Sequence, residues 1–361
     1  GPCVRTNQLD FDDEVAFCAR QKLYDIARER EAGIDDRPFC MVASLTHPHD
    51  PYAIGREYWD LYRDDEIDMP AVSLSRDESD PHSQRVRAVC EIDRTPPTPQ
   101  QIRNARHAYY GAVSYVDAQF GAILDALRST GLADNTVIVV TSDHGDMLGE
   151  RGLWYKMTFF ENACRVPLIV HAPQRFAAAR VKASVSHIDL LPTFVELASG
   201  KRRETWPDPI DGSSLMPHLR GEGGHDEALG EYLAEGAIAP IVMIREGRYK
   251  YVHSPADPDQ LFDLVDDPRE LVNLASDARA GNVLEAMRAR ALRRWNLPRL
   301  REQVLVSQRR RRFHYEATTQ GKIASWDWQP FADASQRYMR NHIELDTLEA
   351  MARLPRVAHD P

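Results

Sequence analysis

Two long stretches of the chain repeat apolar residues at the spacing of a helix. Residues 9–31 (LDFDDEVAFCARQKLYDIARERE) have acids in their first turn, and residues 98–131 end in Gly131. Apolar positions that recur every three or four residues form one face of an amphipathic helix, and a glycine often ends it. The same pattern predicts shorter helices at residues 187–200 and 280–296.

Three apolar runs between these helices predict buried strands. They are PFCMVASLTH at residues 38–47, NTVIVVTSD at residues 135–143 and RVPLIVHAP at residues 165–173. Runs without polar alternation are typical of strands that are covered on both faces. Because a long helix separates the first two runs, we expect an α/β layer with a parallel sheet.

Short strands with turn residues between them replace this pattern after about residue 225. The segments 230–236, 238–253 and 260–270 are close enough in sequence to form a small antiparallel sheet. We therefore predict an α/β domain, a small α+β domain and an extended polar and aromatic tail, at residues 1–225, 226–306 and 307–361.

Composition and charge disfavour several classes of function. The 361 residues are 43% hydrophobic and 28% charged, which is typical of a globular chain with a large core. The formal net charge is -10, and we interpret the basic cluster at residues 309–312 as a solvated helix end or a salt-bridged face, so we expect no nucleic-acid partner. No apolar run approaches the roughly 20 residues of a membrane span. Five scattered cysteines indicate reduced thiols and a cytoplasmic protein.

Polar clusters follow two of the predicted strands, as THPHDPY and as SDHGD. In open α/β sheets, ligands bind beyond the carboxyl ends of the strands. Asp143 and His144 offer an oxygen and an imidazole nitrogen that suit a divalent cation, and Lys156 could face a tetrahedral anion. Asp146 and Glu150 either orient His144 or are exposed loop carboxylates. The spacing alone leaves open that Asp143 only caps a turn and that His144 is an ordinary loop histidine.

A family resemblance adds to this reading of the residues. The segments YYGAVSYVDAQFGAILDAL, GLADNTVIVVTSDHGDMLGERGLWYKMTFFENACRVPLIVHAP and HIDLLPTFVELA resemble the sulfatase branch of the alkaline phosphatase superfamily. PFCMVASLTHPHDPY and the segment ASWDWQPFADASQRYMRNH near the C-terminus are similar to choline sulfatases. The resemblance implies a three-layer α/β sandwich of the alkaline phosphatase type with a smaller C-terminal α+β domain and a tail. It also implies hydrolysis of choline O-sulfate to choline and sulfate.

The resemblance implies a role for each polar residue that matches the family pattern. Asp143 and His144 match a pair of metal ligands, with Ca²⁺ as the expected ion and Mg²⁺ or Mn²⁺ as alternatives. Lys156 matches the lysine that contacts the transferred sulfuryl group. His49 matches the histidine at the leaving oxygen, where it would act as a general acid. His47, two residues away, ranks second, as a substrate-binding residue on the same strand face if the strand persists.

The sequence also departs from the family pattern. Sulfatases use a formylglycine made from the Cys or Ser of Cys/Ser-x-Pro/Ala-x-Arg, and none of the five cysteines here fits that motif. The family's first pair of aspartate ligands after an apolar strand is missing as well. Because the chain starts at GPCVRTNQ without Met, we expect an N-terminally truncated chain. Its full-length parent would be a sulfatase, and this chain alone would be inactive.

Candidates for the choline head group come from the C-terminal part of the chain. A trimethylammonium group is best held by aromatic faces and a carboxylate, and Trp326, Trp328 and Glu235 offer these groups. The tail aromatics could equally well only clamp the tail to the body. A tail of this length could also reach a second copy, so we expect a homo-oligomer.

Two alternatives to choline sulfatase activity stay open. The Asp-His pair also occurs in phosphonate monoester and phosphodiester hydrolases of the same superfamily. A non-catalytic, degenerate homologue is the other alternative, because no nucleophile motif is present.

Overall fold

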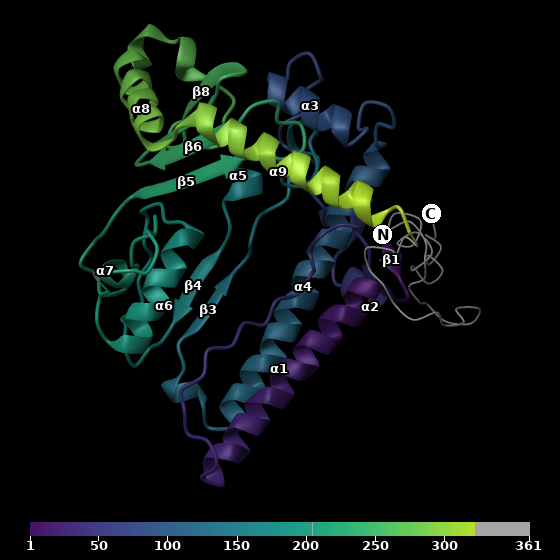
Figure 1. Cartoon of the computed structure of the whole chain (residues 1–361). Helices are drawn as coiled ribbons and strands as arrows, with labels where there is room; N and C mark the ends of the chain where they lie inside the picture. The colour runs from purple at the N-terminus through teal and green to yellow at the C-terminus, as the bar shows by residue number, and fades with distance from the viewer. Residues whose placement is uncertain (204, 322–361) are drawn as a thin grey trace. The chain divides into compact units, whose positions relative to one another are not determined.

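The computed structural model describes residues 1–203 and 205–321 (Figure 1). The chain divides into two compact units. Unit 1 comprises Gly1–Ala71, Pro96–Thr136 and the chain from Tyr315 onward, and unit 2 comprises Val72–Thr95 and Val137–His314. The two units interleave along the sequence. The predicted domain boundaries after residues 225 and 306 stay predictions.

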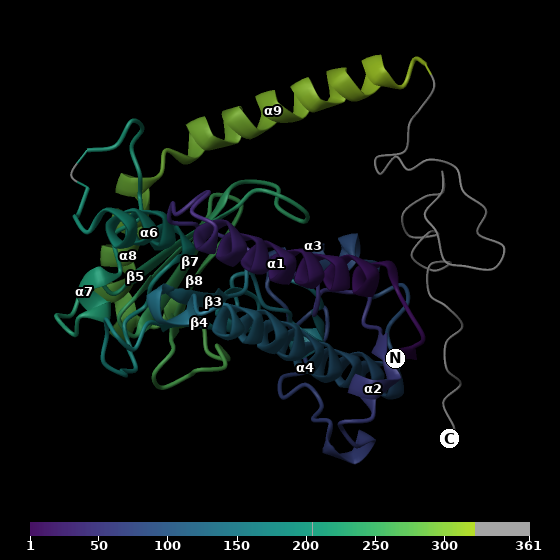
Figure 2. The same ribbon diagram turned by 90° about the horizontal axis from the view of Figure 1, so that it is seen from below.

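A pair of long helices forms much of unit 1. α1 (Asn7–Glu31) and α4 (Pro99–Ser129) lie side by side (Figures 1 and 2), and both predicted helices are confirmed. The hydroxyls of Thr6 and Thr98 cap the first turn of each helix by accepting a backbone N–H. Such caps satisfy donors that the first turn leaves without a partner.

Short elements close one end of this helix pair. β1 (Pro2–Cys3) pairs in parallel with β2 (Ile54–Gly55), and α2 (Arg56–Trp59) follows directly. Their side chains meet those of α1 and α4 in a core of buried residues: Cys3, Leu9, Ala53, Ile54, Trp59, Ala108, Ala112 and Tyr115.

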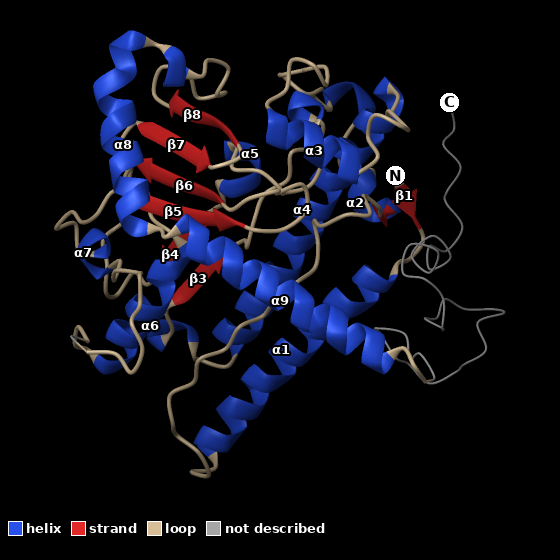
Figure 3. Ribbon diagram, turned by 45° about the horizontal axis from the view of Figure 1, so that its top comes forward, coloured by secondary structure: helices blue, strands red, loops and turns tan. Residues whose placement is uncertain are grey.

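An antiparallel sheet of four strands dominates the C-terminal half of unit 2 (Figure 3). Its strands are β5 (Glu227–Tyr232), β6 (Ile241–Glu246), β7 (Tyr249–Ser254) and β8 (Asp257–Asp263), and each pairs with the next. α8 (Gly281–Arg294) packs on it through Leu284, Met287 and Ala291. The predicted small sheet and the helix after it are confirmed.

Two of the three predicted long strands form, but their pairing differs from the prediction. β3 (Ile138–Thr141) and β4 (Leu168–His171) pair antiparallel with each other, so the parallel arrangement expected for this layer is wrong here. A parallel connection needs a crossover, usually a helix. The chain between β3 and β4 instead contains loops, a short 3₁₀ turn and the one-turn helix α5 (Glu161–Cys164).

Residues 38–47 do not form the predicted strand. An apolar run becomes a strand only where a neighbouring strand takes up its backbone hydrogen bonds, and the described residues provide no such neighbour. Val42 in this run is 83% exposed, and Ile169 in β4 is 57% exposed. Neither run is covered on both faces, as the apolar pattern had suggested.

The remaining helices complete the two units. α6 (Leu190–Ser199) ends at Gly200, whose φ of 70° is left-handed, and it confirms the predicted helix. α3 (Pro81–Val89) and α7 (Met216–Leu219) are further helices of unit 2. Single turns of 3₁₀ helix lie at Asp64–Glu66, Ala133–Asn135, Glu150–Gly152, His187–Asp189, Leu274–Ser276 and Ala278–Ala280.

The long helix α9 (Leu297–Thr318) runs across residue 307, where we predicted the start of the tail. After Pro298 this stretch has no glycine or proline and is rich in Arg, Glu, Gln and Leu, which favour helix. The basic cluster at residues 309–312 is exposed on it. Trp326 and Trp328 lie outside the described residues.

Candidate active site

A tight loop follows β3 and carries three of the predicted site residues. It includes five residues with left-handed backbone: Leu148, Gly149, Arg151, Gly152 and Tyr155. For a residue with a side chain this conformation costs roughly 1–2 kcal/mol and persists only where the surroundings enforce it. Two backbone bonds close the loop, from Met147 N to Tyr155 O and from Gly149 N to Leu153 O, both 2.8 Å.

The loop is fixed from inside by buried side chains. Met147 and Leu153 are fully buried and contribute to a core that also contains Val86, Phe160, Ala163 and Phe262. The carboxylate of Asp146 accepts from the backbone N–H of Leu148 at 2.8 Å and of Tyr155 at 3.2 Å, so it ties both sides of the loop together. Glu150 accepts from Val72 N at 2.9 Å. Both acids thus bind backbone groups, a role that neither sequence-based alternative included.

Asp143 and His144 stand at the start of this loop. Oδ1 of Asp143 accepts from His144 N at 2.9 Å, and Oδ2 lies 3.6 Å from His144 Nε2. The Asp143 side chain is 86% exposed. His144 Nδ1 lies 2.8 Å from the carbonyl of Gly145; because a carbonyl only accepts, Nδ1 carries the proton. Nε2 of a neutral His144 is then unprotonated, as a metal ligand must be.

Gly145 anchors this pair to α5. Its N–H donates to Ala163 O at 2.8 Å, and a Cβ placed on it would lie 2.0 Å from Asn162 O. No side chain fits in that space, so only glycine allows the backbone after His144 to approach α5 so closely.

Lys156 stands at the other end of the loop and is half-buried. It follows Tyr155, whose φ is 67°, and its carbonyl accepts from Thr158 N at 2.7 Å. Nε2 of His82 lies 2.7 Å from the next carbonyl, that of Met157, and so donates to it. The backbone on both sides of Lys156 is therefore held in place.

His47 and His49 belong to unit 1 and face different surroundings. The two are joined by a turn in which His49 N donates to Thr46 O at 3.1 Å, so they do not share a strand face. His47 is buried, with Nδ1 2.7 Å from Asp12 Oδ2, and its buried Nε2 has no hydrogen-bond partner among the described residues. Nδ1 of His49 lies 2.8 Å from Asp50 O, and its side chain is 37% exposed.

Asp12 is a residue of this region that sequence reasoning missed. It is fully buried and accepts from the backbone N–H of Thr46 at 2.6 Å and of His47 at 2.9 Å, as well as lying against the His47 ring. The sequence contained a sign of this role. Asp12 lies on the buried stripe of α1 between Leu9 and Ala16, and an acid in an apolar stripe requires a partner.

Glu235 is exposed in unit 2, and its carboxylate accepts from the hydroxyl of Tyr232 at 3.1 Å. The ring of Tyr232 packs edge-on against His82 at a centroid distance of 5.4 Å. Burial and the neighbouring Glu235 raise the pKa of Tyr232, so the hydroxyl stays a donor. The arrangement places a carboxylate beside an aromatic ring, which are the two groups that an organic cation prefers.

The donor set for a metal ion is only partly present. Asp143 Oδ2 and His144 Nε2, 3.6 Å apart, can both contact one cation. Among residues 1–203 and 205–321, no group of three or more His, Cys, Asp or Glu side chains is arranged to hold an ion. The two residues therefore fit a metal as part of a ligand set that needs further members.

Three family profiles match the chain. The sulfatase profile matches residues 4–201, the N-sulphoglucosamine sulphohydrolase C-terminal profile matches residues 149–296, and the choline sulfatase C-terminal profile matches residues 302–354. Within the described residues, no helix has the length and apolar content to cross a membrane.

Individual relatives agree with these profiles. A choline-sulfatase of Rhizobium meliloti (strain 1021) is 45% identical over 355 residues, which are 97% of this chain and 69% of the relative. Arylsulfatase K of Xenopus laevis is 36% identical over 50% of this chain and 35% of its own length. The solved phosphonate monoester hydrolase of Agrobacterium radiobacter has a TM-score of 0.63 at 26% identity, over 78% of this chain and 60% of that one.

The solved structure confirms the fold class expected from the sequence, an α/β fold of the alkaline phosphatase and sulfatase type with a further C-terminal part. The chain spans about two thirds of the choline-sulfatase and smaller parts of the other two relatives. The sulfatase profile covers more than half of the chain, and the choline-sulfatase is similar along nearly all of it. The chain therefore belongs to the sulfatase family.

Proposed function

We propose that the complete gene product hydrolyses choline O-sulfate to choline and sulfate. The observation that carries this proposal is the 45% identity to a choline-sulfatase over 97% of the chain. The match of residues 302–354 to the choline sulfatase C-terminal profile supports the same substrate.

Asp143 and His144 would hold the divalent cation of this reaction. Two observations support this role. Asp143 Oδ2 and His144 Nε2 are 3.6 Å apart, and the hydrogen bond to Gly145 O keeps the proton of His144 on Nδ1, which leaves Nε2 for the metal. We expect Ca²⁺, with Mg²⁺ or Mn²⁺ as alternatives. A bound divalent ion supplies Lewis-acid polarisation of the sulfuryl oxygens and holds the nucleophile.

Lys156 would place its ammonium beside the transferred sulfuryl group. A fixed cation at this point stabilises the negative charge that grows in the transition state, and it needs no reorganisation if its backbone is already held. The left-handed Tyr155 before it and the His82 bond to Met157 O after it support such preorganisation.

His49 would donate a proton to the departing choline oxygen. The Asp50 carbonyl fixes the proton of Nδ1, and the half-exposed ring then offers Nε2 for proton transfer. His47 ranks second, since its ring is tied to Asp12 in the core of unit 1. Its Nε2, which has no hydrogen-bond partner in the part of the chain that the structure describes, keeps it a candidate.

We propose that the nucleophile, a formylglycine, is not among these 361 residues, because none of the five cysteines stands in the family motif. The described residues bring no further ligands together around Asp143 and His144 to complete the set. These residues by themselves would then not turn over substrate.

The choline head group would meet Glu235, with Trp326 and Trp328 as further contacts. The carboxylate beside the Tyr232 ring supports the role of Glu235. We also propose a cytoplasmic homo-oligomer, and the five free cysteines, Cys3, Cys18, Cys40, Cys90 and Cys164, are consistent with a reducing compartment.

A phosphonate monoester or phosphodiester hydrolase is the second candidate. The similarity to a solved phosphonate monoester hydrolase and the adjacent Asp143 and His144 favour it. The two functions differ in the group that the site transfers and in the need for a cation pocket.

A substrate comparison separates the two candidates. The complete gene product, co-expressed with a formylglycine-generating enzyme, is assayed with choline O-sulfate, 4-nitrophenyl sulfate and a phenylphosphonate ester. We expect the highest kcat/KM for choline O-sulfate, and we expect Glu235→Gln to raise KM for this ester more than for the aryl sulfate. A higher kcat/KM for the phosphonate ester would establish the second candidate instead.

A further inference from the structure

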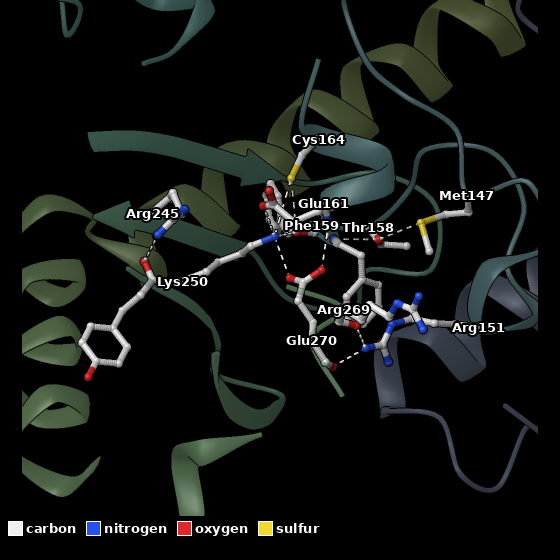
Figure 4. Close-up of polar contacts among 12 residues, drawn as sticks. Met147, Arg151, Thr158, Phe159, Glu161, Cys164, Arg245, Lys250, Arg269 and Glu270 are labelled. Carbon is white, nitrogen blue, oxygen red and sulfur yellow. Dashed lines mark hydrogen bonds and ion pairs between the residues drawn. The ribbon is translucent and has the colours of Figure 1, made fainter. Parts of the chain in front are cut away.

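A cluster of buried charges lies in unit 2 near α5, outside the residues that we assign to catalysis. Lys250 of β7 is fully buried, and its Nζ donates to Phe159 O at 2.6 Å. The same Nζ forms ion pairs with Glu161 at 2.8 Å and with Glu270 at 2.6 Å (Figure 4). A buried ammonium costs several kcal/mol unless it is paired in this way.

Glu270 connects this cation to the backbone around it. Its side chain is 3% exposed, and its second carboxylate oxygen accepts from Glu161 N at 2.9 Å. The residue itself has a left-handed φ of 57°, a conformation that requires support from its surroundings. Cys164 lies 3.8 Å from Lys250, and burial raises the pKa of its thiol to about 11, so it is a neutral neighbour and not a third anion.

The cluster holds α5, a single helical turn that could not persist alone. Lys250 binds the carbonyl just before this turn, and Glu270 binds its first N–H. The same turn presents Ala163 O to the N–H of Gly145 and packs Asn162 O against its Cα. The backbone that follows His144 thus rests on a turn that three charged side chains keep in place.

The second half of the loop that follows β3 also contacts the surroundings of this cluster. The guanidinium of Arg151 lies 4.1 Å from the centre of the Phe160 ring, immediately before α5. It donates to the carbonyls of Arg269, at 2.9 Å, and of Glu270 (Figure 4). Both halves of the loop therefore have contacts that lead to Glu270 or to α5.

We propose that Lys250, Glu161 and Glu270 form a positioning cluster that sets the orientation of Asp143 and His144 through α5. None of the three acts on substrate. The cluster determines how closely the carboxylate and the imidazole are held to the geometry that one cation requires, and thereby the metal affinity of the loop. This inference rests on the proposed function of the pair.

A stabilising role alone would have different consequences. Replacing a buried ion pair by apolar residues of similar size often leaves stability unchanged or raises it, whereas removing one partner leaves an unpaired charge. The double variant Lys250→Met/Glu270→Met therefore removes the anchor without a buried lone charge at either position. Glu161 is 23% exposed, so its side chain can reach water in this variant.

Hydrogen exchange and Ca²⁺ titration of the metal-stripped, complete gene product test the proposal. In the double variant we expect amides of residues 143–149 to exchange at least about tenfold faster, while those of β6 and β7 stay protected. We expect Ca²⁺ to bind roughly 10–100-fold more weakly, as for other changes behind metal ligands. Glu270→Gln, which keeps an acceptor for Glu161 N, should retain most of both properties.

Arg288→Met is the matched control. Arg288 of α8 pairs at 2.7 Å with Asp259 of β8, a strand of the same sheet as Lys250, and has no contact with the loop after β3. We expect this variant to be less stable, with unchanged Ca²⁺ affinity and unchanged exchange at residues 143–149. If the double variant does not fold, Glu161→Leu carries the same test, because its partly exposed position tolerates the change.

Unchanged exchange and Ca²⁺ affinity in a folded double variant would overturn the proposal. Equal losses in Arg288→Met would also overturn it, because the effect would then follow stability in general. A wild-type protein whose Ca²⁺ affinity does not depend on Asp143 would instead contradict the proposed metal role. The exchange measurement would still decide whether the cluster positions the loop.

Discussion

Removing the carboxylate of Asp12 should destabilise unit 1 far more than its place near the start of a helix suggests. Asp12 is 0% exposed, and three donors converge on it: Thr46 N, His47 N and His47 Nδ1. In Asp12→Ala all three would lose this acceptor, and the two donors of His47 are buried. At about 1–2 kcal/mol for each unsatisfied donor, the loss is roughly 3–6 kcal/mol. The better helix propensity of alanine returns only about 0.5 kcal/mol of this loss.

Asp10→Ala is the matched control for this change. Asp10 lies two residues earlier in the same helix and pairs with Arg5, but its side chain is 45% exposed. An exposed pair of this kind contributes about 0–1 kcal/mol. The expected difference between the two variants is therefore several kcal/mol, a large part of the 5–15 kcal/mol that stabilises a typical domain.

Two measurements check this expectation. Urea unfolding, monitored by circular dichroism, gives the free energy of unfolding of each variant. Hydrogen exchange reports directly on the backbone amides of Thr46 and His47. In Asp12→Ala these two amides should lose their protection before the rest of unit 1 unfolds. If Asp12→Ala were within about 1 kcal/mol of Asp10→Ala, the buried carboxylate would not be the anchor that the distances indicate.

Three further predictions concern unit 2. Lys156→Ala should lower kcat on choline O-sulfate by about 10²–10³, measured on protein that circular dichroism shows to be folded, and an unchanged kcat would remove Lys156 from the site. Gly145→Ala should destabilise the protein by about 1–3 kcal/mol in urea, because its Cβ would lie 2.0 Å from Asn162 O; a neutral effect would mean that α5 is free to move. The Cys164 thiol has a pKa raised by burial to about 11, so it stays protonated in the fold while the unfolded thiol ionises near pH 9. The preference of the fold for the protonated thiol stabilises the protein fully below pH 9, and this contribution is lost as the pH rises to 11. The difference in free energy of unfolding between wild type and Cys164→Ala should therefore shrink over this range. A constant difference would contradict this prediction.

The sequence predicted those parts of the fold that depend on local pattern. The four helices at residues 9–31, 98–131, 187–200 and 280–296 and the small antiparallel sheet carry their periodicity and end signals in the chain itself. The predicted strand at residues 38–47 is wrong because a strand depends on a partner strand, which the apolar pattern does not specify. The predicted parallel pairing of β3 and β4 is wrong because a connection without a crossover helix brings the second strand back antiparallel.

The candidate site was predictable as residue types but not as geometry. Asp143, His144 and Lys156 came from their position after a strand and from the family resemblance. The shape of the loop depends on left-handed Leu148 and Tyr155, and such residues give no sign in the sequence because their conformation is imposed by contacts elsewhere. The contribution of Lys250 was hidden for a similar reason, since its partners are 89 residues before it in Glu161 and 20 residues after it in Glu270.

The most direct test of the proposed function is sulfate release from choline O-sulfate by the complete gene product and by its Asp143→Ala variant, at saturating Ca²⁺. Among the described residues, the exposed Asp143 side chain contacts only His144, so the variant should unfold at the same urea concentration. We predict sulfate release by the wild type and a loss of at least about 100-fold in the variant, as expected for a metal ligand. Release at the wild-type rate by the variant, or no release from choline O-sulfate by a formylglycine-containing wild type, would contradict the proposed function.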